Sequence, residues 1–558
     1  MNSTIKSQPD LFKIITPINV NKFESPLQHH PNLPLIDSVG QSLREGAWPF
    51  ATINPDNPTM HDFSTCILND PAMDFIQEQC NIEISEGRYS ISFGTELLPG
   101  MYTPPIGAVP KPHSTNLRLI NDHSASPHSP NAWIDKSESH VRLDNLHDLG
   151  TILCSVTTRR GHPPRWLFKS DVLAPYRRWP MHPLWQLKQV VTIDGERHID
   201  RCMVFGSRSS PRIWCTFMGL VTWIAIHVYS IEDLLHYMDD AFTYDTDPTL
   251  QYYHPHDTHY PSKQCRLLTL WDDIGLPHEQ RKQVFGQCID IIGFFVNPVE
   301  MSFTMPSDSK EALIMAIRVF IDTSALRRRP LVEWQHLLGW INWGLNTFPL
   351  LKPGLQSSYE KIRGKSNAHA SIYLNKQVIA DLHWVADTME MSSGLFYFNA
   401  TEWTPTDADT IIFCDASLTG LGFYCPALNI AYHADIADTV PTRTIFFYES
   451  LAVRSALSWT LDSLPTIHRL LIYTDSMNTV EMFHSLSALP GYNDLLMHAV
   501  GLLIPSSLSL RVLHIPGSEN TVADALSRGL FHVALAQHPG LIIRLFQPPP
   551  TVSGAVIQ

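Results

Sequence analysis

The chain has 558 residues, of which 44% are hydrophobic and 10% aromatic, a composition that is typical of folded proteins and excludes wholesale disorder. A chain of this length should divide into roughly three or four compact units. Its formal net charge of -14 argues against a protein that coats nucleic acid through overall charge. Any polyanion would have to be held by metal ions or by local basic clusters, which occur at Arg159–Arg160, Arg177–Arg178, Arg327–Arg329 and 361–365.

Cysteine usage and the chain start indicate an intracellular protein. The nine cysteines form no C-x-x-C pair, so neither a disulfide framework nor a cysteine zinc site is indicated, and a reducing compartment fits best. The first twenty residues lack the basic flank and apolar run of a secretory signal. We expect a protein of the cytoplasm or nucleus that is not secreted.

The predicted elements fall into five segments. Residues 1–90, rich in Pro, Asn and His, are predicted to be an N-terminal extension with a short helical patch at 35–50. Strand-like runs alternate with helical segments over 91–304, which predicts a mixed domain. Helical periodicity dominates 305–404. A second mixed unit, with the order strand, turn, strand, helix, strand, helix, strand and helix, covers 405–530, and 531–558 is predicted to be an extended, proline-containing tail.

One apolar stretch could be taken for a membrane span. Ile213–Ile231 carries no Asp, Glu, Lys or Arg and has about the length needed to cross a bilayer. Its Thr, His and Ser content favours a buried helix of the core. We therefore expect no membrane association.

A first carboxylate cluster lies near the middle of the chain. Asp239 and Asp240 stand between apolar runs, which predicts a β-hairpin with the acids at its tip. Adjacent carboxylates repel unless cations intervene, and Asp171 at the end of the strand-like "WLFKS" offers a third acid. Acids on two neighbouring strands could hold a pair of Mg²⁺ ions about 3.5 to 4 Å apart, with Mn²⁺ as an alternative, the arrangement used for in-line phosphoryl transfer.

A second carboxylate cluster is predicted in the C-terminal unit, where acids stand at the ends of regular elements. Ser476 is placed to cap one of the helices, Asn520 to cap another, and Gly529 to end it. Four acids that converge from a sheet and its helices would form a second two-metal site, here able to activate water. These acids are Asp415, Glu449, Asp475 and Asp524.

The tetrapeptide Tyr237–Asp240, "YMDD", resembles the signature hairpin of reverse transcriptases, and further pieces follow in the order of that family. The resemblance implies a right-hand polymerase fold with fingers, palm and thumb, in which Asp171, Asp239 and Asp240 are catalytic metal ligands. It implies that Tyr176 lies under the incoming sugar and excludes a 2'-hydroxyl. It also implies nucleotide-binding roles for Lys111 and Arg118 in "VPKPHSTNLRLINDHS", for Phe205, Gly206 and Pro211 in "MVFGSRSSPRIWCTFM", and for Lys282, which would protonate the departing pyrophosphate.

The segment "HIPGSENTVADALSRG" resembles the closing segment of retrotransposon ribonuclease H domains. This resemblance implies a ribonuclease H-like α/β domain with Asp415, Glu449, Asp475 and Asp524 as catalytic metal ligands. A polymerase followed by this nuclease is the retroelement arrangement, and "HPNLPLIDSVGQSLREGAWPF" with the "LFQPPPTVSGAVIQ" tail suggests elements of the DIRS or fungal type. The combined resemblance covers roughly residues 90–530.

The chain departs from the family pattern in its basic residues. No lysine follows Lys376, and only Arg511 is basic between Asp475 and Asp524, so the nuclease should depend on the upstream domain to hold its substrate. His514 is interpreted as a structural strand residue. The cluster His254, His256 and His259 lacks a supporting ligand set and is interpreted as a polar loop, not a zinc site.

Two functions are weighed. The first is an RNA-directed DNA polymerase with ribonuclease H activity, whose partners are an RNA template, a DNA primer, the RNA–DNA hybrid and dNTPs. The second is an inactive retroelement remnant that keeps the fold and nucleic-acid binding. A DNA-templated polymerase is a third reading, and template preference separates it from the first. The sequence leaves the oligomeric state open.

Overall fold

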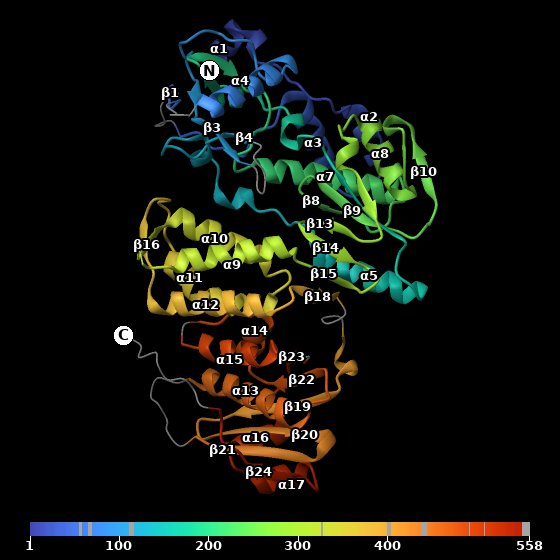
Figure 1. The fold of residues 1–558 in the computed structure, drawn as a ribbon, viewed down its shortest axis with the longest axis vertical. Helices are drawn as coiled ribbons and strands as arrows, with labels where there is room; N and C mark the ends of the chain where they lie inside the picture. The colour runs from blue at the N-terminus through green and yellow to red at the C-terminus, as the bar shows by residue number, and fades with distance from the viewer. Residues whose placement is uncertain are drawn as a thin grey trace. The chain divides into compact units, whose positions relative to one another are not determined.

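The computed structural model describes residues 1–54, 59–64, 70–110, 117–324, 327–398, 403–436, 444–489, 491–506 and 508–549. The chain divides into two compact units, Met1–Ile292 and Gly293–Gln558, coloured from blue to yellow-green and from yellow to red in Figure 1. The length predicts three or four units. Two form because the segment before residue 90 shares a core with the mixed domain that follows it, and the helices after residue 305 contact the second mixed domain.

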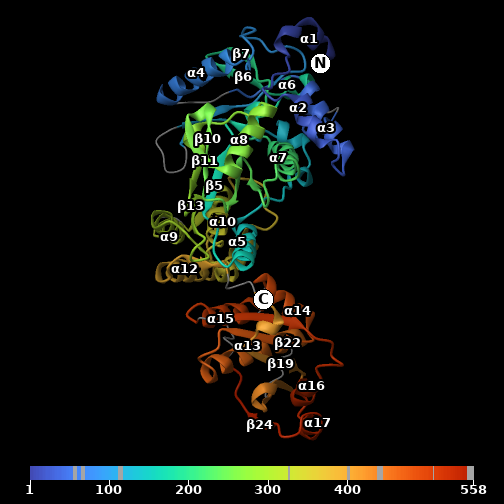
Figure 2. The same ribbon diagram turned by 90° about the vertical axis from the view of Figure 1, so that its right-hand side faces the viewer.

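A four-stranded antiparallel sheet forms the centre of unit 1. Its strand order is β12-β5-β9-β8. Helices α7 and α8 lie beside it (Figure 2), and their Trp214 and Trp271 are buried in one core with Phe168 of β5 and Ala241 of β9. These elements are β5 (Trp166–Asp171), β8 (Leu235–Tyr237), β9 (Asp240–Asp245), β12 (Val284–Gly286), α7 (Ser210–His227) and α8 (Ser262–Ile274).

Residues 213–227 of the apolar stretch lie in α7, and most of their large side chains are buried in the core of unit 1. The prediction of a buried core helix is confirmed. Among the residues that the structure describes, no helix combines the length and the apolar character that a membrane crossing requires.

The N-terminal segment contributes to the same core. Phe23 and Leu27 are fully buried, and the ring centroid of Phe23 lies 5.1 Å from that of Phe217 on α7. The other helices of unit 1 are α1 (Asn2–Ser7), α2 (Val20–Glu24), α3 (Leu33–Glu45), α4 (Asp70–Ser85), α5 (Leu146–Arg160) and α6 (Pro183–Gln186). Paired short strands complete it: β1 (His61–Asp62) with β2 (Tyr102–Thr103), β3 (Ile106–Pro110) with β4 (Leu117–Asn121), β6 (Val190–Ile193) with β7 (Glu196–Ile199), and β10 (Leu250–Tyr253) with β11 (Thr258–Pro261), followed by β13 (Ile289–Ile291).

Unit 2 begins with the predicted helical segment. On α9 the buried residues Leu313, Ile317 and Phe320 recur at helical spacing, so one face packs inward. The helices are α9 (Ser307–Ile321), α10 (Leu331–Gly344), α11 (Gln356–Ile362) and α12 (Lys376–Met391), and the strands between and around them are β14 (Phe294–Asn297), β15 (Ser302–Thr304), β16 (Arg328–Pro330), β17 (Ser371–Tyr373) and β18 (Leu395–Tyr397).

A six-stranded mixed sheet follows, in the order β23-β22-β19-β20-β21-β24. Strands β19 to β21 are antiparallel, whereas β22, β23 and β24 run parallel to their inner neighbours. The strands are β19 (Thr410–Ala416), β20 (Gly420–Cys425), β21 (Ile430–Asp435), β22 (Arg469–Thr474), β23 (Ser509–His514) and β24 (Ile542–Leu545), and the helices are α13 (Ile445–Ser463), α14 (Met477–Ser485), α15 (Asn493–Leu503), α16 (Thr521–Ser527) and α17 (Phe531–Gln537).

Four elements of the sheet and its helices were not predicted: β21, α15, α17 and β24. Strand β21 pairs with β20 after a left-handed Asn429, and α15 stands as a separate helix before β23. Residues 531–545, expected in the extended tail, form α17 and β24 instead. The reason is the apolar run that begins at Leu541, which buries Leu541 and lets β24 pair with β21.

The two faces of the sheet carry separate cores because side chains alternate along each strand. Leu421 and Phe423 of β20 pack with α13, whereas Gly422 between them faces α16. A β-carbon at Gly422 would lie 2.6 Å from the Ser527 nitrogen. Glycine is therefore required for α16 to approach the strand this closely.

Candidate active sites

The predicted hairpin is present at the tip of β8 and β9. Tyr237 pairs with Asp240, which leaves Met238 and Asp239 as the two turn residues. Met238 has φ of +55°, the sign that two-residue hairpin turns require. Trp214 of α7 holds this turn by donating from Nε1 to the Met238 carbonyl oxygen at 3.0 Å.

The third acid of the cluster lies across the sheet. Asp171 at the end of β5 is directly opposite Asp240, and the Val172 N–H donates to the Asp239 carbonyl oxygen at 3.2 Å. Burial raises the pKa of Asp239, and the neighbouring Asp171 raises it further. Burial raises the pKa of Asp240 to about 6 against the opposing effect of Lys169. The negative charge of this cluster is thus only partly compensated, and a cation would stabilise it.

Lys282 contacts the cluster directly. Its Nζ donates to Asp171 Oδ1 at 2.6 Å from the short helix η7 (Gln280–Lys282). This ammonium supplies one positive charge beside the acids. Within the described ranges, Asp171, Asp239 and Asp240 do not bring one oxygen each within 4.8 Å of the other two.

Tyr176 and Arg118, two of the residues with implied nucleotide-binding roles, lie close enough to Asp239 to interact with it electrostatically. Tyr176, on η5 (Pro175–Arg178), has its ring centroid 4.8 Å from that of Phe205, and the Arg118 guanidinium lies 5.5 Å from the Phe205 ring. Burial, with a contribution from Asp239, raises the pKa of Tyr176, so its phenol stays neutral at physiological pH. The charge of Arg118 in turn lowers the pKa of Asp239. Lys111 lies outside the described residues.

The Phe205–Gly206 turn is fixed by its surroundings. Gly206 has φ of +117°, and a β-carbon there would lie 2.3 Å from the Asn121 carbonyl oxygen. The Asn131 side chain donates to the Gly206 carbonyl oxygen at 2.7 Å. Pro211 occupies the first turn of α7, where a missing N–H removes no helical hydrogen bond.

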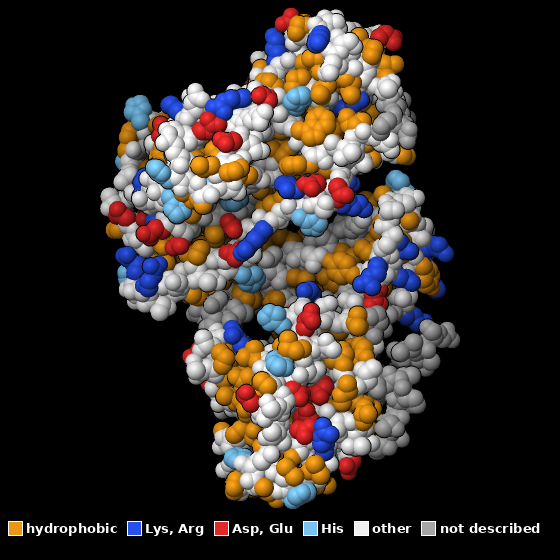
Figure 3. Space-filling model, turned by 180° about the vertical axis from the view of Figure 1, so that it is seen from behind, with side chains coloured by type: hydrophobic (Ala, Val, Ile, Leu, Met, Phe, Trp, Pro, Cys, Tyr) orange, Lys and Arg blue, Asp and Glu red, His pale blue; other side chains and the backbone are white. Residues whose placement is uncertain are grey.

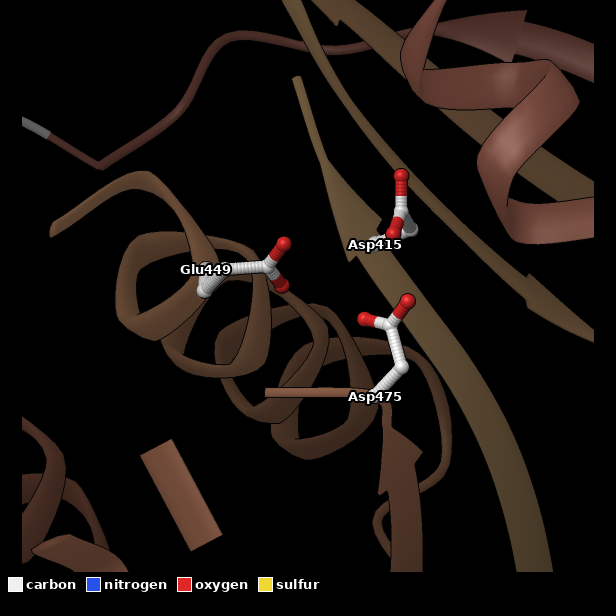
Figure 4. Close-up of side chains that lie close together, drawn as sticks. All are labelled: Asp415, Glu449 and Asp475. Carbon is white, nitrogen blue, oxygen red and sulfur yellow. The ribbon is translucent and has the colours of Figure 1, made fainter. Parts of the chain in front are cut away.

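The second cluster brings three of its four predicted acids together. Asp415 comes from β19, Glu449 from α13, and Asp475 from the residue after β22, and their carboxylates point into a common space (Figure 4). One ligand oxygen from each lies within 4.8 Å of the others. Glu449 is held by the Ala416 N–H, which donates to Oε1 at 3.3 Å, and by the Thr474 hydroxyl, which donates to Oε2 at 3.4 Å.

Burial and mutual repulsion disfavour the ionised form of the acids in this cluster. Burial raises the pKa of Asp415 to about 7 and that of Glu449 to about 8, and Asp475 adds repulsion to both. The Asp415 Oδ2 atom is buried and has no hydrogen-bond partner. Three carboxylate oxygens at this spacing, in a cluster that also holds the unsatisfied Asp415 Oδ2, fit a hard divalent cation such as Mg²⁺, which prefers oxygen ligands.

The fourth acid, Asp524, lies on α16 and is close enough to raise the pKa of Asp415. Its Oδ1 is 2.7 Å from the guanidinium of Arg528, one turn further along. The prediction that Asn520 caps α16 through its side chain is wrong. The Asn520 side chain instead donates to the Cys414 carbonyl oxygen at 2.9 Å and so links the helix to β19. On the face drawn in Figure 3, acidic side chains gather on the surface of unit 2 beside a basic one.

Several smaller predictions can also be assessed. Ser476 caps α14 by accepting from the Thr479 N–H, and Gly529 follows α16 with φ of +69°. His514 ends β23 opposite Thr474, as expected of a strand residue. Within the described part of the chain the histidines at 254, 256 and 259 belong to no metal-binding group.

Sequence reasoning missed residues that act through distant contacts. Asn131 belongs to no sequence motif, Arg177 stands out only as part of a basic cluster and Arg528 only as part of the segment "HIPGSENTVADALSRG", and the folded structure brings each of them to its site. Arg528 had a local signal, because it stands four residues after Asp524, at the spacing of a helical ion pair.

No family model and no curated protein matches the sequence. The chain is similar to solved structures of a foamy viral protease-reverse transcriptase. In complex with RNA/DNA hybrid the identity is 14% and the TM-score 0.43, over 91% of this chain and 65% of that one. For the dRH form in complex with ds DNA the identity is 16% and the TM-score 0.41, over 92% of this chain and 85% of that one. For the complex with dsDNA the identity is 14% and the TM-score 0.42, over 90% of this chain and 98% of that one. The chain thus spans slightly less than two thirds of the first of these proteins.

Proposed function

We propose that the protein is an RNA-directed DNA polymerase with ribonuclease H activity, which copies a retroelement RNA into DNA and degrades the RNA strand of the hybrid. One observation carries this proposal: a single chain holds two separate carboxylate clusters, each at the ends of sheet strands. In unit 1 Asp171 lies opposite Asp240 beside the Met238 turn, and in unit 2 Asp415, Glu449 and Asp475 converge within 4.8 Å.

In the polymerase site, Asp171, Asp239 and Asp240 would hold Mg²⁺ or Mn²⁺. The bound ions would activate the primer 3'-hydroxyl and neutralise the triphosphate. Arg118, together with Lys111, would bind the triphosphate of the dNTP. Lys282, whose Nζ lies 2.6 Å from Asp171, would give a proton to the departing pyrophosphate.

The wall of the nucleotide site is formed by Tyr176 and Phe205. With their ring centroids 4.8 Å apart, the two rings support each other, and Tyr176 would lie under the sugar of the incoming nucleotide. A ribose carries a 2'-hydroxyl that this ring would meet. The site would therefore select deoxynucleotides.

In the nuclease site, Asp415, Glu449, Asp475 and Asp524 would hold the cations, whose chemistry there would be to make a water more acidic for attack on the RNA phosphodiester. The 2'-hydroxyl of the substrate distinguishes RNA from DNA. Because no lysine follows Lys376, the basic clusters earlier in the chain would hold most of the duplex backbone.

The test is primer extension and RNA cleavage with the full chain, Mg²⁺, dNTPs and an RNA template. Asp239→Asn should abolish extension and leave cleavage of a preformed RNA–DNA hybrid, whereas Asp415→Asn should do the reverse. A wild-type chain that neither extends nor cleaves would contradict the proposal and leave the inactive remnant that binds nucleic acid. Preference for a DNA template in the same assay would identify a DNA-templated polymerase.

A further inference from the structure

A group of charged side chains is buried in unit 1 outside its carboxylate cluster. Arg177 donates from Nη2 to Glu83 Oε2 at 2.6 Å, and its Nη1 lies 2.9 Å from Asp200 Oδ1. Arg88 donates to both oxygens of Glu83, at 2.7 and 2.9 Å. The side chain of Asp200 is 0% exposed and that of Arg177 is 11% exposed. Arg177 thus joins two buried acids, one of which it shares with Arg88, and Arg88 also pairs with Glu86.

Arg177 links the two segments that carry the wall of the nucleotide site. It directly follows Tyr176 on η5, and its Nη1 also donates to the Met203 carbonyl oxygen at 3.0 Å, two residues before Phe205. The Met203 N–H returns a hydrogen bond to the Trp179 carbonyl oxygen at 2.9 Å. The two segments that carry the Tyr176 and Phe205 rings are thus joined by one hydrogen bond from Arg177 and one from the Met203 N–H.

The chemistry of this group indicates a positioning role. Buried ion pairs add little net stability, because removing both charges from water costs about as much as their attraction returns. What a guanidinium supplies is a rigid fork of donors that fixes its partners in direction. The segment that carries Tyr176 begins after Ala174 with φ of +49°, a left-handed conformation that a residue with a β-carbon keeps only when its surroundings enforce it.

We propose that Arg177 is a positioning residue that sets the discrimination between deoxy- and ribonucleotides by holding Tyr176 against Phe205. The inference rests on the proposed polymerase function and adds to it a residue that does not touch the nucleotide. Glu83 on α4 and Asp200 anchor Arg177, so sugar selection depends on contacts behind the wall as well as on the wall itself.

The experiment compares Arg177→Lys with wild type in primer extension, measuring kcat/KM for a dNTP and for the matching rNTP. Lysine keeps the charge and loses the fork. The ratio of the two kcat/KM values should fall about tenfold or more, since displacements of about 1 Å in a reacting complex have effects of this size. A variant that loses both activities equally, or keeps the ratio, overturns the proposal.

Arg197→Lys is the matched control, because Arg197 is a buried arginine of the same unit that pairs with Asp62 at 2.5 Å. Its ratio should stay within about twofold of wild type. Asp200→Asn, which keeps the shape of the anchor and removes its charge, gives a second variant should Arg177→Lys not fold. Its ratio should fall in the same direction.

Backbone hydrogen exchange gives a readout that needs no catalysis. Arg177→Lys should accelerate exchange both in 174–179 and at Met203, whose carbonyl oxygen accepts from Arg177. Acceleration confined to 174–179 would overturn the positioning role. If the wild-type chain extends no primer, the proposed function fails, and the selectivity role fails with it. If wild type extends the primer and Arg177→Lys keeps the wild-type ratio of kcat/KM for dNTP and rNTP, only the positioning role is contradicted and the proposed function stands.

Discussion

Replacing Glu449 with glutamine should stabilise the metal-free protein at alkaline pH. Glu449 is 6% exposed, and its pKa is raised to about 8 by burial and by Asp415 and Asp475. Without a cation, ionising this group places a third negative charge in the cluster. Glutamine has nearly the same shape, and its oxygen can still accept from the Ala416 N–H, as Glu449 Oε1 does at 3.3 Å.

The size and sign follow from proton linkage. In the unfolded chain Glu449 should titrate near its ordinary value of 4.5, and in the folded protein near 8. Between these values only the folded state keeps the proton, so the free energy of unfolding decreases as the pH rises. Each pH unit contributes about 1.4 kcal/mol. The full penalty is therefore on the order of 5 kcal/mol above pH 8, and it is absent below pH 4.5.

The assay is calorimetric melting in EDTA at about pH 5 and about pH 8.5, with Glu481→Gln as the matched control because Glu481 is an exposed glutamate of the same unit. Glu449→Gln should have a higher melting temperature than wild type at about pH 8.5, and the difference in melting temperature should be smaller at about pH 5. Saturating Mg²⁺ should stabilise wild type more than the variant. Equal melting temperatures at pH 8.5, or a gap that widens on acidification, would refute the reasoning.

Three further predictions follow from the structure. Lys282→Met should slow extension and leave RNA cleavage unchanged, because it removes the ammonium beside Asp171; a single-turnover extension assay with a cleavage control checks this. Gly422→Ala should destabilise unit 2 by about 1 to 3 kcal/mol, since its β-carbon would lie 2.6 Å from the Ser527 nitrogen; RNA cleavage should be lost at lower temperature than in wild type, and unchanged heat sensitivity would count against the packing argument. Affinity for an RNA–DNA hybrid should decrease linearly on a log–log plot against salt concentration if backbone phosphates carry the binding, and a flat plot would contradict that source of affinity.

The parts of the site that the sequence predicts are those set by short-range patterns. Two apolar strands separated by two residues specify the hairpin, so Asp239 and Asp240 had to lie at its tip. Asp171 could be added because strand ends of one sheet meet at an edge. The four nuclease acids likewise stand where elements begin or end, and three of them meet within 4.8 Å.

The remaining features depend on contacts between residues far apart in the chain. Arg177 is 94 residues from Glu83 and 23 from Asp200, and nothing local to η5 indicates either partner. Strand β24 could not be inferred from its own short apolar run, because only pairing with β21 distinguishes it from an extended tail. Periodicity reports which face of an element is buried and not what buries it.

The two clusters differ in how their negative charge is compensated, and this difference should govern their response to metal. In unit 1 the ammonium of Lys282 lies 2.6 Å from Asp171. In the described part of unit 2 no lysine or arginine pairs with Asp415, Glu449 or Asp475, and Arg528 pairs with Asp524 instead. A lysine that already stands beside the acids lowers the cost of keeping them ionised, whereas the nuclease acids must keep protons or take up a cation. Chelation should therefore cause proton uptake mainly at the nuclease cluster near neutral pH, and an Asp415→Asn variant should lose most of that uptake in a pH-stat measurement.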